Sequence, residues 1–210
     1  MNSSCKLCQK RRARRLCPGV GGEICAVCCG TERENTIECP SQCEYLQDAR
    51  KHELPAIAKI EVHAEDIPNR DINVNEEFIR AHEGELLWLA HATVRAMESA
   101  KAVDDDAREA LAAMIQTYRT LESGLIYDTR PQNPYAARVQ DSLKESVEEL
   151  RKKLAEETGL HQLRDSDVLG TLVFLQRLEL QYNNGRRRGR AFYDFLRGYF
   201  PVPNQTSVAL

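Results

Sequence analysis

Apolar residues recur at helical spacing along most of the chain beyond residue 74. A stripe that includes Phe78, Leu86 and Met97 predicts a helix over 74–103. Further stripes predict four more elements of the same kind, at 107–127, 134–158, 166–182 and 191–199. The stripe over 166–182 occupies more than one face, so we expect that helix to be the most buried. The pattern indicates an antiparallel bundle of four or five helices.

Polar and turn-forming residues separate these stripes. Asp104–Asp106 offer a negatively charged helix start, and Asn133 before Pro134 is typical of a capped first turn. Gly159 and the run Asn183-Asn184-Gly185 end the two helices that precede them. We therefore assign residues 74–200 to a helical bundle, residues 54–73 to a connector and residues 201–210 to a disordered tail. A short strand in the connector is suggested by Ile57, Ile60 and Val62. Pro68 and Asn69 favour a loop instead.

The first part of the chain differs from the bundle because it contains every cysteine. All eight lie between Cys5 and Cys43. Their order includes two Cys-x-x-Cys pairs and one adjacent doublet: Cys5, Cys8, Cys17, Cys25, Cys28, Cys29, Cys39 and Cys43. We predict that residues 1–53 form a metal-binding head that ends in a short helix through Tyr45 and Leu46, with Cys43 in its opening turn.

Clustered cysteines form either disulfides or a metal site, and the cellular compartment decides between the two. Residues 1–10 are polar and are followed by an arginine-rich run, without the apolar segment of an export signal. We therefore expect a cytoplasmic protein whose reduced thiols hold metal ions.

The spacing predicts how the thiols divide. A Cys-x-x-Cys pair on a tight turn directs two thiolates at one ion, and two pairs complete a tetrahedral zinc shell. Cys5, Cys8, Cys25 and Cys28 match this pattern, which leaves Cys17, Cys29, Cys39 and Cys43 for a second shell. Neighbouring side chains in an extended segment point in opposite directions, so we assign Cys28 and Cys29 to different ions. The prediction is two structural zinc ions; other partitions, one zinc site with spare thiols, and an iron–sulfur cluster are the alternatives.

The interleaved pairs resemble the two-zinc cross-brace fingers of the HIT and MYND type, which are treble-clef-like. The resemblance covers Cys5 to Leu46, about a fifth of the chain, and departs from those fingers in the Cys28-Cys29 doublet and in lacking a histidine ligand. The string CCGTERE…IECPSQCEYL is also similar to uncharacterised bacterial Cys-rich proteins. The HIT and MYND resemblance implies a finger that holds protein partners, and neither resemblance implies a reaction.

Two basic runs are candidates for binding anions. They comprise Lys10, Arg11, Arg12, Arg14 and Arg15 in the head, and Arg186, Arg187, Arg188 and Arg190 before the last helix. Arginine forks bind phosphate or carboxylate bidentately, and contact with nucleic acid would release counterions and depend strongly on salt. The interpretation that we favour is a solvated loop in each case, with the arginines of the second run paired to carboxylates of the bundle.

Composition narrows the function. A net charge of −3 argues against a protein that coats nucleic acid. The sequence has no glycine-rich phosphate loop, no Gly-x-Ser-x-Gly elbow and no combination of nucleophile, base and orienting group, so we do not predict an enzyme. We predict an adaptor that binds a protein partner, with no membrane contact and no small-molecule substrate. The alternatives are a nucleic-acid-associated regulator that uses Lys10–Arg15 and a redox sensor that uses Cys28 and Cys29.

Overall fold

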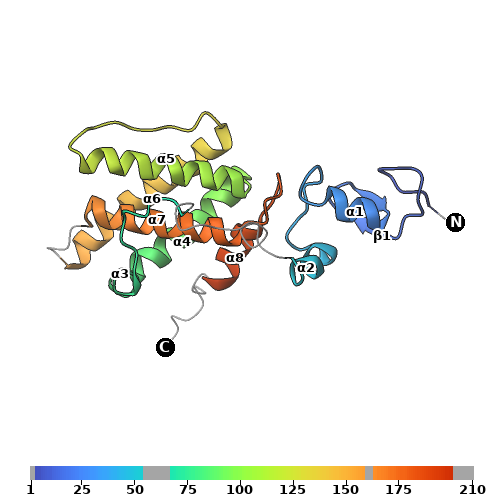
Figure 1. Ribbon diagram of the computed structural model, residues 1–210, viewed down its shortest axis with the longest axis horizontal. Helices are drawn as coiled ribbons and strands as arrows, with labels where there is room; N and C mark the ends of the chain where they lie inside the picture. The colour runs from blue at the N-terminus through green and yellow to red at the C-terminus, as the bar shows by residue number, and fades with distance from the viewer. Residues whose placement is uncertain (1–2, 54–66, 159–162, 201–210) are drawn as a thin grey trace.

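The computed structural model describes residues 3–53, 67–158 and 163–200. The head contains a hairpin of strands β1 (Arg15–Cys17) and β2 (Gly22–Ile24), then helices α1 (Ala26–Glu32) and α2 (Glu44–Arg50) (Figure 1). The strands are antiparallel, with Leu16 opposite Glu23. The candidate strand at Ile57, Ile60 and Val62 and the tail 201–210 lie outside the described residues.

Six helices follow in the remaining described part of the chain. Their bounds are α3 (Glu76–Ala81), α4 (Glu83–Ala100), α5 (Asp104–Glu122), α6 (Pro134–Thr158), α7 (Asp165–Tyr182) and α8 (Ala191–Tyr199). The prediction of a mainly α protein is confirmed. No helix in the described ranges combines the length and the apolar character needed to cross a membrane.

Several helix ends differ from the prediction. The helix expected over 74–103 is interrupted at His82, and it ends at Ala100 because Lys101 adopts a left-handed conformation. The α5 helix ends at Glu122, where Gly124 at φ +76° turns the chain. At the start of α6, by contrast, Asn133 Oδ1 accepts a hydrogen bond from Tyr135 N at 3.0 Å, as its position before Pro134 predicts.

The connection between α5 and α6 reverses the expected chain direction. Asn133, at its end, donates to Asp106 Oδ1 in the first turn of α5 at 2.6 Å. The two helices therefore begin at the same end of the bundle and run the same way, whereas an up-and-down bundle would alternate. Figure 1 shows the connection passing back along the outside of α5. The return path is the physical reason for the departure from strictly antiparallel order.

The protein has two separate apolar cores. Leu89, Leu111, Leu143 and Leu172 lie in the core of the bundle, where α5 packs on α6 and α7, and α4 packs on α6. The head has its own small core, composed largely of cysteines with Ile24 and Ile37. A core this small cannot stabilise the head without a further source of free energy.

A buried carboxylate fastens α8 to the start of α5. Asp104 is only 3% exposed, and its oxygens accept hydrogen bonds from Phe192 N at 2.9 Å and Tyr193 N at 3.2 Å. Burial raises the pKa of Asp104 to about 7, although the two N–H donors act to lower it.

This shift predicts a pH dependence of stability. The unfolded chain releases the Asp104 proton near pH 4, whereas the folded chain keeps it to about pH 7. Stability therefore falls as pH rises through this window, by at most about 1.4 kcal/mol per pH unit. The Asp104→Asn variant cannot ionise, so it should gain stability relative to the parent between pH 5 and pH 8. Urea unfolding of both proteins at the two pH values measures the difference; an unchanged difference would contradict the assignment.

Candidate metal centre

The first four cysteines come together from two turns. Cys5 is fully buried, and Gln9, at φ +53°, returns the chain beyond Cys8 so that Gln9 N donates to Cys5 O at 2.8 Å. Cys25 is the N-cap of α1, and its sulfur accepts a hydrogen bond from Cys28 N at 3.4 Å. Cys25 N in turn donates to Cys5 Sγ at 3.2 Å. These contacts fix the thiols by the backbone around them.

The sulfurs of Cys5, Cys8, Cys25 and Cys28 all lie within 4.8 Å of one another. A tetrahedral ion with Zn–S bonds of about 2.3 Å needs sulfurs separated by roughly 3.8 Å, so a small contraction completes the shell. Because all four donors are thiols, the set fits zinc or another thiophilic ion. The structure thus places the two predicted Cys-x-x-Cys pairs together.

The charges in this cluster favour a bound cation. Burial raises the Cys5 pKa, but hydrogen bonds from the backbone of Cys8, Cys25 and Leu7 outweigh burial and lower the pKa to about 6. Cys28 has the opposite shift: its hydrogen bond with the Cys25 side chain, burial and the other thiols raise its pKa to about 12. Four adjacent thiolates repel one another, and a divalent cation would relieve that repulsion.

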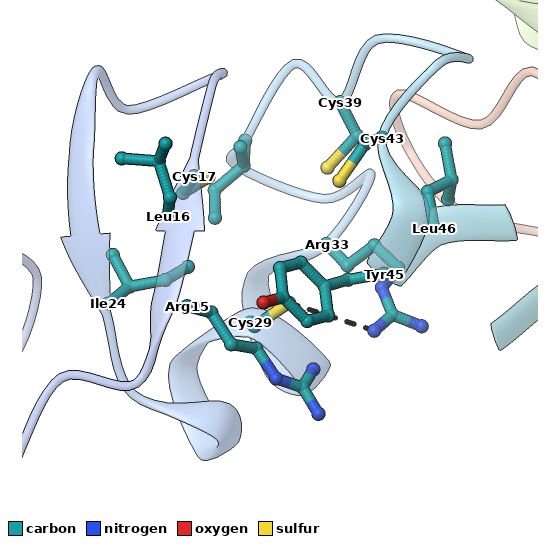
Figure 2. Close-up of a pocket in the computed structure, with 11 residues that line it drawn as sticks. Arg15, Leu16, Cys17, Ile24, Cys29, Arg33, Cys39, Cys43, Tyr45 and Leu46 are labelled. Atoms are coloured by element: carbon teal, nitrogen blue, oxygen red, sulfur yellow. Dashed lines mark hydrogen bonds between the residues drawn. The ribbon is translucent and has the colours of Figure 1, made fainter. Parts of the chain in front are cut away.

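The other four cysteines line a small cavity between β1, α1 and the segment before α2. Cys17 from β1, Cys29 from α1, and Cys39 and Cys43 from the segment before α2 line about 10 Å³ of space. Figure 2 shows the sulfurs of Cys39 and Cys43 next to each other, with Cys17 on the strand to their left and Cys29 below them. Among the described residues, they do not form a cluster as close as the first.

Cys29 has a hydrogen-bond partner within the head. Its sulfur accepts a hydrogen bond from Arg33 Nη2 at 3.7 Å (Figure 2). Cys28 and Cys29 belong to different sets, but for a reason other than the predicted extended strand. They lie in a helix, where consecutive side chains are about 100° apart. One helix therefore supplies a thiol to each set.

The basic run of the head lies on its surface. Lys10, Arg11, Arg12 and Arg14 are exposed, whereas Arg15 is half-buried with its guanidinium 4.8 Å from the centre of the Tyr45 ring. Arg11 lies close to the first thiol cluster. A side-chain hydrogen bond with Cys25 and the charges of Cys25 and Cys8 raise the pKa of Arg11. Contact between this run and nucleic acid stays a prediction.

The second basic run lies in the loop 183–190, which contacts the head. Arg186 Nε donates to Glu53 Oε1 at 2.9 Å, and its Nη1 donates to Arg33 O at 2.9 Å. Arg188 approaches Glu38 at 3.6 Å, and Arg190 lies 5.7 Å over the Tyr193 ring. The carboxylates that receive Arg186 and Arg188 belong to the head, whereas we expected partners in the bundle.

Glu34 is the central residue of this junction. It is 1% exposed, and its carboxylate accepts hydrogen bonds from Arg50 Nη2 at 2.6 Å, Asn184 Nδ2 at 2.9 Å and Arg190 N at 3.1 Å. Arg188 N also donates to Glu34 O at 2.6 Å. Sequence analysis missed Glu34 because its partners in the loop are 150 or more residues away.

Comparison with known proteins adds no relative. No family model, no curated protein and no solved structure matches the chain.

Proposed function

We propose that this protein is a zinc-stabilised adaptor that binds a protein partner. The head holds two zinc ions, one in the Cys5, Cys8, Cys25 and Cys28 set and one in the Cys17, Cys29, Cys39 and Cys43 set. In each set four protein thiolates fill a tetrahedral shell and leave no position for a reacting water, so the zinc is structural. The site supports binding, not catalysis.

The observation that supports binding of a protein partner is an exposed apolar segment on the bundle. Leu125, Ile126 and Tyr127 are consecutive and are 63%, 96% and 66% exposed. They lie in the connection between α5 and α6. Three adjacent exposed apolar side chains of this size are typical of a surface that a partner covers.

Hydrogen bonds hold this segment on the bundle. Leu125 N donates to Thr120 O at 2.9 Å, and Thr120 Oγ1 donates to Tyr127 O at 3.1 Å. Just beyond this segment, Asp128 accepts a hydrogen bond from Lys144 Nζ at 2.6 Å, and Thr129 N donates to Thr117 Oγ1 at 3.0 Å. A backbone fixed in this way presents its side chains with little loss of conformational entropy on binding.

The test is a substitution at the most exposed of the three residues. Tagged Ile126→Asp and parent proteins would be compared for the proteins that they retain from the native cells, with Leu87→Asp on α4 as the matched control. We expect Ile126→Asp to keep its folded stability and to lose the retained partner, whereas Leu87→Asp keeps both, because Leu87 lies outside the apolar segment. Equal retention by Ile126→Asp and the parent would contradict the proposal.

A further inference from the structure

A polar cleft of about 660 Å³ lies where the head meets the bundle. The head contributes Asn35, Thr36, Glu38 and Cys39 to its wall. The bundle contributes Lys101, Val103, Asp106 and Tyr135, together with Arg187, Arg188 and Arg190 of loop 183–190. Volumes of a few hundred to about 1,000 Å³ are usual for sites that bind small molecules. The size of the cleft thus suits a small ligand.

The cleft is positively charged although the protein as a whole is negative. Four cationic side chains line it (Lys101, Arg187, Arg188 and Arg190), against the two carboxylates of Glu38 and Asp106. The chain has a net charge of −3. A local excess of cations in a concave site attracts anions, because low-dielectric walls concentrate the field.

The carboxylates of Asp106 and Glu38 do not form an ion pair with each of the four cations. Asp106 accepts hydrogen bonds from Val103 N at 2.8 Å and from Asn133 Nδ2 at 2.6 Å. Glu38 has only a long, exposed contact with Arg188, at 3.6 Å. Within the described part of the chain, Lys101 and Arg187 form no ion pair, and both are exposed. These two side chains are therefore free to receive an anion.

The backbone conformation of Lys101 sets where this residue lies relative to the cleft. Lys101 ends α4 in the left-handed region, at φ 55° and ψ 36°. Glycine is the usual residue at such a helix end, and a residue with a Cβ costs about 1 kcal/mol there. The end of α4 thus places Lys101 on the wall of the cleft.

We propose that this cleft binds a phosphate monoester, with the phosphate between Lys101 and Arg187 and the body of the ligand against Tyr135. Arginine and lysine supply the donors that phosphate prefers, and the Tyr135 ring, 48% exposed, offers a flat apolar surface. Because both the head and the bundle line the cleft, the bound ligand would contact both parts of the protein.

The experiment measures binding of adenosine monophosphate to the full-length, zinc-loaded chain by calorimetry at low salt. Adenosine, inorganic phosphate and a twelve-nucleotide oligothymidylate serve as comparison ligands. The test variant is Lys101→Gln with Arg187→Gln. The control is Arg12→Gln with Arg14→Gln, which removes the same charge from the exposed run of the head.

We expect the monophosphate to bind the parent and the control alike and adenosine not to bind. The test variant should bind at least about tenfold more weakly, because each lost charge-assisted contact costs about that factor or more. Equal weakening in both variants would show general charge attraction and would overturn the proposal, as would unchanged binding in the test variant. Loss of oligothymidylate binding in the test variant, with no monophosphate binding by the parent, would assign the cleft to nucleic acid instead.

Discussion

Cys25→Ser protein should bind one zinc ion where the parent binds two, and the part of its head around the first set should unfold while the bundle keeps its helices. Serine is a good helix N-cap, so its hydroxyl can still accept from Cys28 N and the start of α1 is preserved. The missing element is one thiolate of the first set. Structural zinc contributes about 10–16 kcal/mol of apparent binding free energy to small fingers, far more than the core of the head can supply.

Metal analysis together with amide hydrogen exchange measures this result. Exchange should become fast at Cys5 and Ile24 and remain slow at Leu111 and Leu172, because the two cores are separate. Cys39→Ser is the matched control, since it removes a thiol from the other set and should also leave one ion. Two bound ions in Cys25→Ser, or a joint loss of head and bundle, would contradict two zinc sites in an independently stabilised head.

Glu34→Ala is expected to release loop 183–190 from the head. The substitution removes the buried acceptor of Asn184 and of Arg190 N, and it leaves Arg50 with Asp194 as its remaining carboxylate. Breaking a buried, hydrogen-bonded ion pair typically costs about 3–5 kcal/mol. Amide exchange at Arg190 should therefore accelerate by at least a hundredfold, since about 3 kcal/mol corresponds to that factor.

Glu34→Gly separates the side chain from its backbone. Glu34 has φ +53°, which strains any residue with a Cβ. The glycine variant loses the same carboxylate but is relieved of this strain, so urea unfolding should find it about 1 kcal/mol more stable than Glu34→Ala. If exchange at Arg190 stayed slow in both variants, the carboxylate would not be what holds the loop.

Local patterns predicted the helices of the bundle because each depends on residues a few positions apart. The Asn133 cap and the stripe through Leu143 are examples. The two Cys-x-x-Cys pairs could likewise be assigned to one cluster from spacing alone. In each case, the contact that matters joins near neighbours, or follows from known ligand geometry.

Features that depend on distant contacts could not be read from the sequence. The direction of α6 follows from Asn133 meeting Asp106, and the burial of Glu34 follows from Asn184. Short elements of the head were also missed. The three-residue strands and α1 are too short to show a periodic pattern of apolar residues. Lys101 carried no signal either, because only the folded backbone shows its left-handed conformation.

The separation of Glu34 from Asn184 also bears on the order in which the protein assembles during its synthesis. Every thiol is present once Cys43 has been translated, so the head can acquire metal while most of the chain does not yet exist. The loop that covers Glu34 follows about 150 residues later, which at about 5–20 residues per second is a delay of roughly 8–30 s. During that interval the Glu34 carboxylate is hydrated at the surface of the nascent head. The head is then the earlier-formed template onto which the last-made part of the bundle docks.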